Sequence, residues 1–271
     1  MPELPEVETT RRGIEPHVKD QHIERLAVHD ARLRWPVATE LPALVRGQRI
    51  TGVRRRAKYL LIDLENGSLL LHLGMSGNLR VVPASTPRLT HDHLDLQLGS
   101  GLTLRFNDPR RFGSLHYVIG DASLHPLLRL LAPEPLEAEF DAAYLHRITR
   151  KRRVAIKLAI MNSQLVVGVG NIYASEALFR AGIRPGRAAR SLTHLECARL
   201  VTAIRRVLAM AIRFGGTTLR DYVGADGKPG YFRRKLYVYD RGGEPCRRCG
   251  TPVRHLAHGQ RSTYYCPRCQ H

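Results

Sequence analysis

Four cysteines near the C-terminal end are the residues best suited to bind a metal. They form two Cys-x-x-Cys pairs separated by 16 residues, and they are Cys246, Cys249, Cys266 and Cys269. Two thiolate pairs at this spacing can close over one tetrahedral Zn²⁺. Four thiolates complete the coordination, so we predict one structural zinc ion and look for catalysis elsewhere. Redox-active or reactive thiols are the alternative, and His255, His258 and His271 could compete as ligands.

The second candidate for chemistry is Pro2, which follows the initiator Met1. Removal of Met1 would leave a secondary amine. An α-amino group has a pKa of about 7.7 to 8.0, against about 10.4 for lysine, so more of it is neutral and nucleophilic at cell pH. Its attack on an aldehyde-level carbon gives an iminium ion that acidifies the adjacent carbon. Glu3 could supply a proton to an opening sugar ring or a leaving group. An ordinary processed terminus is the alternative.

The charge of the chain indicates its class of partner. Among 271 residues, 43 Lys and Arg stand against 24 Asp and Glu, for a formal charge of +19. Basic residues that neutralise phosphates release counterions, so we expect a nucleic acid as partner. A solvated basic surface and an anionic membrane surface are the alternatives. No segment approaches the roughly 20 apolar residues of a spanning helix, and the acidic, proline-bearing start predicts no secretory signal. We therefore expect no membrane partner and a cytoplasmic protein.

Short alternating runs predict antiparallel β-structure in the first half of the chain. Tyr59–Leu64 and Leu69–Leu73 flank Asn66-Gly67, a strong hairpin signal. A second pair comprises Leu94–Leu98 and Leu102–Phe106. These runs favour a sandwich or barrel that carries at least one helix.

Helices are expected at the start of the chain and throughout its second half. The first runs from about Pro5 to Gly13, with acidic residues early and basic residues late. Val154–Met161 and Ile172–Arg180 follow, and the latter closes at Gly182. Thr193 and Glu196 have the spacing of a capping box. The next helix presents one apolar face up to Gly215-Gly216, made of Leu200, Ile204, Val207, Leu208 and Ala211, and Cys197 within it is expected to be a small buried residue.

Several motifs together resemble the bacterial formamidopyrimidine-DNA glycosylase family. They are Pro2–Glu8, Ala57–Leu61, His72–Gly77, Asn107–Gly113, Val167–Ala174, Gly227–Phe232, Gln260-Arg261 and the four-cysteine tail. They extend from one end of the chain to the other. The resemblance implies an α+β fold with an N-terminal antiparallel β-sandwich and flanking helices, a C-terminal helix-two-turn-helix domain and a zinc-finger hairpin with four cysteine ligands. The implied division is a catalytic domain over 1–132, a linker over 133–150, the helical DNA-binding domain over 151–235 and the finger over 236–271.

The resemblance also implies catalytic roles. Pro2 would be the nucleophile at the sugar C1′, Glu3 an acid/base group and Lys58 a lysine that assists, while Arg261 on the finger completes this set. Without the family, Lys58 could equally belong to the phosphate-binding run that begins at Arg54. Glu6 would be a second carboxylate in the site, or a surface residue matched to the helix dipole.

DNA-binding roles are implied in the same way. Met75, Arg110 and Phe112 resemble a set that fills the gap left by a flipped nucleotide. Phosphate contacts are implied for Lys157 and Asn171 as well as for Arg261. Further residues expected to contact the lesion or the DNA are Glu6, His72, His93, Arg220 and Tyr239. The segment Thr217–Tyr231, within a glycine-rich stretch expected to be a mobile loop, would be a lid over the flipped base. Arg220 stands where the family would have Lys, and Asn162 where it would have Asp.

The expected function is a bifunctional DNA glycosylase and abasic-site lyase that removes 8-oxoguanine and formamidopyrimidines and then cleaves the strand by β,δ-elimination. Its partner would be damaged double-stranded DNA, bound in a cleft between two domains. The protein would act as a monomer in the bacterial cytosol, associated with the nucleoid. Two alternatives remain, an endonuclease VIII-type glycosylase for oxidised pyrimidines and a non-catalytic lesion-binding protein.

Overall fold

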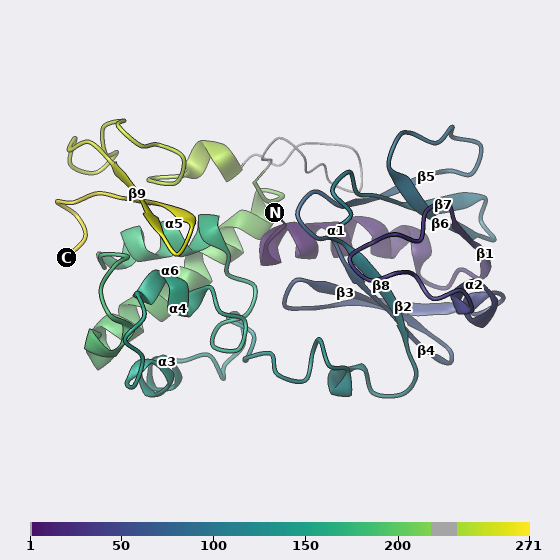
Figure 1. Ribbon diagram of the computed structural model, residues 1–271, viewed down its shortest axis with the longest axis horizontal. Helices are drawn as coiled ribbons and strands as arrows, with labels where there is room; N and C mark the ends of the chain where they lie inside the picture. The colour runs from purple at the N-terminus through teal and green to yellow at the C-terminus, as the bar shows by residue number, and fades with distance from the viewer. Residues whose placement is uncertain (1, 218–231) are drawn as a thin grey trace. The chain divides into compact units, whose positions relative to one another are not determined.

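A computed structural model describes residues 2–217 and 232–271 (Figure 1). The chain divides into two compact units. The first comprises Met1–Arg129 with Phe214–Arg233, and the second Leu130–Arg213 with Arg234–His271. Strands dominate the first unit, whereas the second holds helices and the cysteine-bearing hairpin. The expected α+β class is confirmed.

Two four-stranded antiparallel sheets form the sandwich of the first unit. One sheet has the order β1 (Ile23–Val28), β6 (Asp92–Leu98), β7 (Leu102–Asn107), β5 (Asn78–Pro83). The other has the order β2 (Ile50–Arg56), β3 (Tyr59–Leu64), β4 (Gly67–His72), β8 (Ser114–Val118). The expected hairpin between β3 and β4 is confirmed, but Leu64 pairs with Gly67. The turn is therefore Glu65-Asn66, one residue earlier than the sequence signal.

The core of the first unit draws on both sheets and on one side of helix α1 (Leu4–Val18). Ile62 and Leu71 from one sheet and Leu96 and Phe106 from the other belong to one buried cluster. Val7, Ile14 and Val18 of α1 join it, as do residues of the short helix α2 (Leu41–Val45). Burial of Ile14 and Val18 explains why α1 continues past Gly13, where the sequence predicted its end.

Helices α4 (Ile156–Ile160), α5 (Asn171–Ala181) and α6 (His194–Arg213) organise the second unit. The capping box of α6 is confirmed, since the Thr193 N–H donates to Glu196 over 2.8 Å and the Glu196 N–H donates to the Thr193 hydroxyl over 3.2 Å. Gly182 ends α5 with φ of 72°, as expected for a left-handed cap. The predicted apolar face of α6 is buried, together with Cys197.

The stretch 133–150 is more ordered than the linker that the sequence predicted. It contains helix α3 (Ala142–Thr149), which the Asp141 carboxylate caps at the Tyr144 N–H over 2.7 Å. Leu145 is fully buried. Arg205 of α6 donates to carbonyl oxygens of this stretch, which fixes it to α6.

The remaining elements are short. Strands β9 (Arg254–His258) and β10 (Arg261–Tyr265) pair as an antiparallel hairpin. The described parts of the chain also contain the 3-10 helices η1 (Ala122–Leu124), η2 (Ala189–Ser191) and η3 (Phe232–Lys235). None of the described helices has both the length and the apolar composition needed to cross a bilayer.

Candidate active site and zinc centre

The start of α1 holds two buried carboxylates next to Pro2. Glu3 is 2% exposed and Glu6 is 1% exposed. The Glu3 N–H donates to Glu6 Oε2 over 2.9 Å, and a reciprocal bond to the Glu3 side chain completes a capping box. Pro2 is itself buried. The helix N-terminus therefore fixes the backbone on which the predicted nucleophile and its neighbouring acid are carried.

Glu6 also binds the segment that enters the predicted lid. Its Oε1 accepts from the Thr217 N–H over 2.7 Å and from the Thr217 hydroxyl over 2.9 Å. Gly216 has φ of 80°, which favours glycine, and a Cβ there would lie 2.9 Å from the same oxygen and would displace the Glu6 side chain. The Phe232 N–H donates to the Gly216 carbonyl, which closes the base of this segment. Arg220 and the rest of 218–231 lie outside the described residues.

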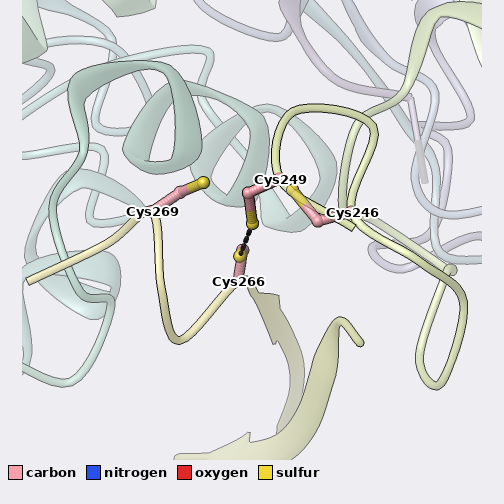
Figure 2. A group of neighbouring side chains, drawn as sticks. All are labelled: Cys246, Cys249, Cys266 and Cys269. Atoms are coloured by element: carbon pink, nitrogen blue, oxygen red, sulfur yellow. Dashed lines mark hydrogen bonds between the residues drawn. The ribbon is translucent and has the colours of Figure 1, made fainter. Parts of the chain in front are cut away.

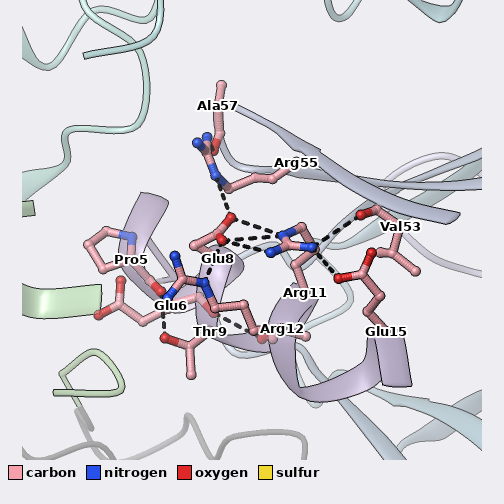
Figure 3. A network of polar contacts seen from close by, with 11 residues as sticks. Pro5, Glu6, Glu8, Thr9, Arg11, Arg12, Glu15, Val53, Arg55 and Ala57 are labelled. Atoms are coloured by element: carbon pink, nitrogen blue, oxygen red, sulfur yellow. Dashed lines mark hydrogen bonds and ion pairs between the residues drawn. The ribbon is translucent and has the colours of Figure 1, made fainter. Parts of the chain in front are cut away.

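Lys58 lies in the two-residue turn between β2 and β3, and an ion-pair network holds that turn. Ala57 beside it has φ of 55°, an unfavourable value for alanine. Arg55 donates to the Ala57 carbonyl over 3.0 Å and to Glu8 Oε2 over 3.2 Å. Glu8 belongs to α1, so one carboxylate connects the helix of Glu3 with the turn of Lys58 (Figure 3).

Three arginines surround Glu8, a residue that sequence reasoning did not single out. Arg11 and Arg12 of α1 donate to it besides Arg55 (Figure 3). Burial acts to raise the pKa of the Glu8 carboxyl, but the hydrogen bonds from Arg11 and Arg12 and the charge of Arg55 outweigh it and hold the pKa below its usual value. Glu8 therefore stays ionised and anchors the Lys58 turn throughout the neutral range.

His72, at the end of β4, lies against the same turn. It pairs with Tyr59 across the sheet, with ring centroids 4.8 Å apart. Its Nδ1 accepts from the Gly74 N–H over 3.0 Å. Burial, Lys58 and Arg34 lower its pKa to about 4, so the ring is neutral at physiological pH. Neutral His72 can offer a hydrogen bond to a phosphate but no charge.

The depressed pKa of His72 predicts a specific dependence of stability on pH. Below pH 6.5 the unfolded chain takes up a proton at His72 that the folded chain binds only near pH 4. The free energy of unfolding should fall as the pH drops through this window, by up to about 3 kcal/mol. We expect His72→Gln to lose this component. Denaturant titrations of both proteins at pH 7 and pH 5 measure the difference, and equal pH sensitivity would contradict the prediction.

Met75, Arg110 and Phe112 lie on two loops that the structure joins. A Cβ at Gly74, where φ is 67°, would lie 2.5 Å from the Gly113 nitrogen, so the loops touch through their backbones. Fully buried Asp108 accepts from the Ser76 hydroxyl and from the Gly113 N–H, both over 2.8 Å. This carboxylate therefore holds the loop of Met75 against that of Arg110 and Phe112.

His93 is buried beneath the loop that carries Arg110. It is 3% exposed, and its Nε2 lies 2.9 Å from the Asp108 carbonyl oxygen. In the structure His93 supports the loop of Arg110 from inside the protein. A buried histidine next to a loop has no sequence signal that distinguishes it from an exposed one.

The second unit gathers its own set of predicted DNA contacts. Asn171 is the first residue of α5 after a glycine turn, and its side chain is half-buried. Arg261 is exposed at the tip of the β9–β10 hairpin. Lys157 is fully buried, and its Nζ donates to the Ser262 carbonyl over 2.7 Å and to the Thr263 hydroxyl over 2.8 Å. The Lys157 ammonium thus secures the strand that carries Arg261.

Glu176 of α5 is a further functional candidate that sequence reasoning missed. It is fully buried, and its carboxylate accepts the backbone N–H groups of Tyr237, Val238 and Tyr239 over 2.9 to 3.0 Å. Burial raises the pKa of this carboxyl, while the three backbone donors act to lower it. The Tyr239 ring packs on Tyr264 of the hairpin. Glu176 therefore positions the predicted contact Tyr239.

Replacing Glu176 should destabilise the second unit. In Glu176→Gln an amide nitrogen replaces Oε2 and cannot accept the bond that the Tyr237 N–H makes to it over 2.9 Å, so two buried donors face each other at a cost of about 1–3 kcal/mol. A lower melting temperature in calorimetry is the expected result. Glu139→Gln, at an exposed position of the same unit, is the matched control and should melt as the wild type does.

The four cysteine sulfurs converge as a metal site requires (Figure 2). All lie within 4.8 Å of one another, and those of Cys249 and Cys266 are 3.5 Å apart. Zn–S bonds of about 2.3 Å in a tetrahedron separate sulfurs by similar distances. Burial and the neighbouring sulfurs raise the pKa of Cys269 to about 12, a crowding that a divalent cation relieves. The four cysteines form a site for one zinc ion, as predicted.

Asn162 differs from the expected Asp without a structural consequence. Its Oδ1 accepts from the Gln164 N–H over 2.9 Å at an exposed position. An aspartate oxygen would accept the same bond. The turn is preserved with either residue.

Comparisons with known proteins agree over the whole chain. Residues 1–115 match the formamidopyrimidine-DNA glycosylase N-terminal domain, residues 131–223 its H2TH domain, and residues 243–271 the zinc finger found in FPG and IleRS. The formamidopyrimidine-DNA glycosylases of Thioalkalivibrio sulfidiphilus and Stutzerimonas stutzeri are 62% and 56% identical, each over 100% of both chains.

Solved structures give the same result. MutM (FPG) from Thermus thermophilus matches with a TM-score of 0.89 and 44% identity over 99% of this chain and 98% of that one. A Lactococcus lactis FPG bound to DNA containing an abasic site matches with a TM-score of 0.91 and 33% identity over 99% of both chains.

The β-sandwich with its acidic N-terminal helix, the helix-two-turn-helix unit and the four-cysteine finger define a DNA glycosylase of base-excision repair. The chain belongs to the formamidopyrimidine-DNA glycosylase family. Such enzymes combine glycosylase and abasic-site lyase activities.

Proposed function

We propose that the protein excises oxidised purines from duplex DNA with Pro2 as its nucleophile once Met1 has been removed. The observation that carries the proposal is the capping box, which buries Glu3 and Glu6 immediately beside Pro2. The Pro2 amine attacks C1′, and the damaged base leaves with a proton. Glu3 exchanges a proton with the opening sugar, and Lys58 assists from its turn.

The iminium ion then permits strand cleavage. Loss of a proton from C2′ expels the 3′ phosphate, and a second elimination expels the 5′ phosphate. The products are an unsaturated sugar fragment and a one-nucleotide gap with phosphates on both sides. The positively charged nitrogen of the iminium ion accepts the electron pair that each lost proton leaves behind, which lowers the barrier to both eliminations.

The remaining site residues are proposed to hold the DNA. Met75, Arg110 and Phe112 fill the gap left by the flipped nucleotide, and Arg110 bonds the orphaned base. His72, Asn171 and Arg261 bind phosphates, with Lys157 acting through the Arg261 strand. Glu6 holds the segment that enters the lid, His93 supports the loop of Arg110, and Tyr239 packs against the hairpin of Arg261. Arg220, in the lid, contacts the flipped base. The four-part division at 132, 150 and 235 remains a proposal. The matched family ranges support a boundary near 132 and a separate finger, whereas residues 133–150 lie within the range matched to the H2TH domain.

Comparing substrates tests the proposal. Duplexes with 8-oxoguanine should be cleaved faster than duplexes with thymine glycol, and borohydride should trap a covalent adduct during cleavage. The opposite substrate order would favour the endonuclease VIII-type alternative. Tight binding to an abasic duplex without cleavage or adduct would favour the non-catalytic alternative, which the intact Pro2, Glu3 and Lys58 argue against.

We also propose that the enzyme acts as a monomer in the bacterial cytosol, associated with the nucleoid and without a membrane partner. Its charge of +19 supports an association with DNA. Light scattering should give a mass of 30.6 kDa in solution, and twice that mass would contradict the monomer.

A further inference from the structure

Trp35 is the single tryptophan of the chain and lies at the surface. It is 39% exposed, and the Arg34 guanidinium lies 4.8 Å from its ring centroid. The His116 ring of β8 meets it edge-on at 5.5 Å. Arg34 is exposed as well. The pair thus presents an aromatic ring and a cation together to solvent, with the ring held from behind by β8.

A second arginine–aromatic pair has the same form. Arg110 lies 5.0 Å from the ring centroid of Phe112, which is 43% exposed. The backbone joins the two pairs, because the Arg34 N–H donates to the Gly113 carbonyl over 3.0 Å. The two exposed rings therefore belong to neighbouring, connected loops of the first unit.

An ion pair between Arg111 and Asp30 connects these loops, and it does not involve the Arg34 guanidinium. Arg111 lies 2.7 Å from Asp30, whose carboxylate also pairs with Arg32. Among the ion pairs of residues 2–217 and 232–271, none involves Arg34. The charge of Arg34 also acts on His72, because it contributes to the lowered pKa of that ring. An exposed guanidinium without a carboxylate, fixed on an aromatic ring, has the chemistry of a phosphate ligand.

We propose that Arg34 and Trp35 form a second DNA-contacting pair that extends the Arg110–Phe112 surface along the strand beside the lesion. Arg34 binds a backbone phosphate. Trp35 keeps the guanidinium in place and packs against the adjoining nucleotide. The inference rests on the proposed function, since the ligand is the same duplex DNA.

The single tryptophan allows a direct test with the wild-type protein. The probe is a duplex with a tetrahydrofuran abasic analogue, and the anisotropy of a labelled copy measures its binding separately. As DNA is added, the tryptophan emission should change and its quenching by acrylamide should fall. Both changes should have the same midpoint as the anisotropy titration. Unchanged emission and quenching at full binding would overturn this inference alone. Absence of binding in anisotropy would overturn both it and the proposed function.

Variants separate the two side chains. Arg34→Gln should reduce the slope of log affinity against log salt by about 0.9, the value for one phosphate contact, while Arg34→Lys should keep the slope. Arg46→Gln removes the same charge from the end of α2 in the same unit and should leave the slope unchanged. Trp35→Leu should weaken binding roughly fivefold or more, and Trp35→Phe should restore most of it. A wild-type slope in Arg34→Gln would overturn the phosphate contact.

Discussion

A protein whose Pro2 nitrogen is acylated should form no borohydride-trapped adduct and should cleave no abasic-site DNA. An uncleaved Gly-Ser extension in front of Pro2 makes this change and keeps every side chain. The nitrogen then becomes an amide that cannot attack C1′. The loss of cleavage activity should therefore equal the loss caused by removing a catalytic nucleophile. Intact mass identifies the two forms, and gel assays on abasic and 8-oxoguanine duplexes compare them.

Glu3→Gln provides the matched comparison for the acylated form. It keeps the free amine but removes the proposed proton donor, so base excision should fall about 10²–10⁴-fold. The measurement is single-turnover cleavage of the 8-oxoguanine duplex. DNA binding by both forms should remain near that of the processed protein. Cleavage by the acylated form at the processed rate would exclude Pro2 as the nucleophile.

Local signals in the sequence predicted local structure well. The β3–β4 hairpin, the Thr193–Glu196 capping box and the Gly182 helix end depend on residues within a few positions of one another. The four cysteines are a further example, because the spacing of the two pairs was enough to predict a metal site. Pro2 and Glu3 were found through the physical chemistry of an amine and through family motifs.

Residues that act through distant partners had no such signal. In the sequence, Glu8 and Glu176 look like ordinary helical glutamates. In the structure each is buried and accepts hydrogen bonds from a residue far away in the sequence. For Lys157 the resemblance to the family implied a phosphate contact, whereas in the structure its ammonium is buried against Ser262 and Thr263. Helix α3 was missed because the prolines before it obscured a short amphipathic segment that packs on α6.

Removal of zinc should strongly weaken DNA binding before it affects the chemistry. A structural zinc site in a small finger contributes on the order of 10–16 kcal/mol to folding, so the hairpin of β9 and β10 should unfold without the ion. Loss of the Arg261 phosphate bond alone, worth about 1.5–3 kcal/mol, corresponds to about 10–100-fold in affinity. Anisotropy with an abasic duplex, before and after chelation, measures this loss.

Two cysteine variants distinguish the metal site from a general effect of thiol removal. Cys249→Ser should lower the zinc content and the affinity, whereas Cys197→Ser, buried in α6 away from the four ligands, should keep one zinc per chain and bind DNA normally. Pro2 belongs to the other unit, so the zinc-free protein should still give the borohydride adduct once its concentration exceeds the weakened Kd. Failure to form the adduct at saturating concentration would mean that the metal site supports the chemistry as well as the binding.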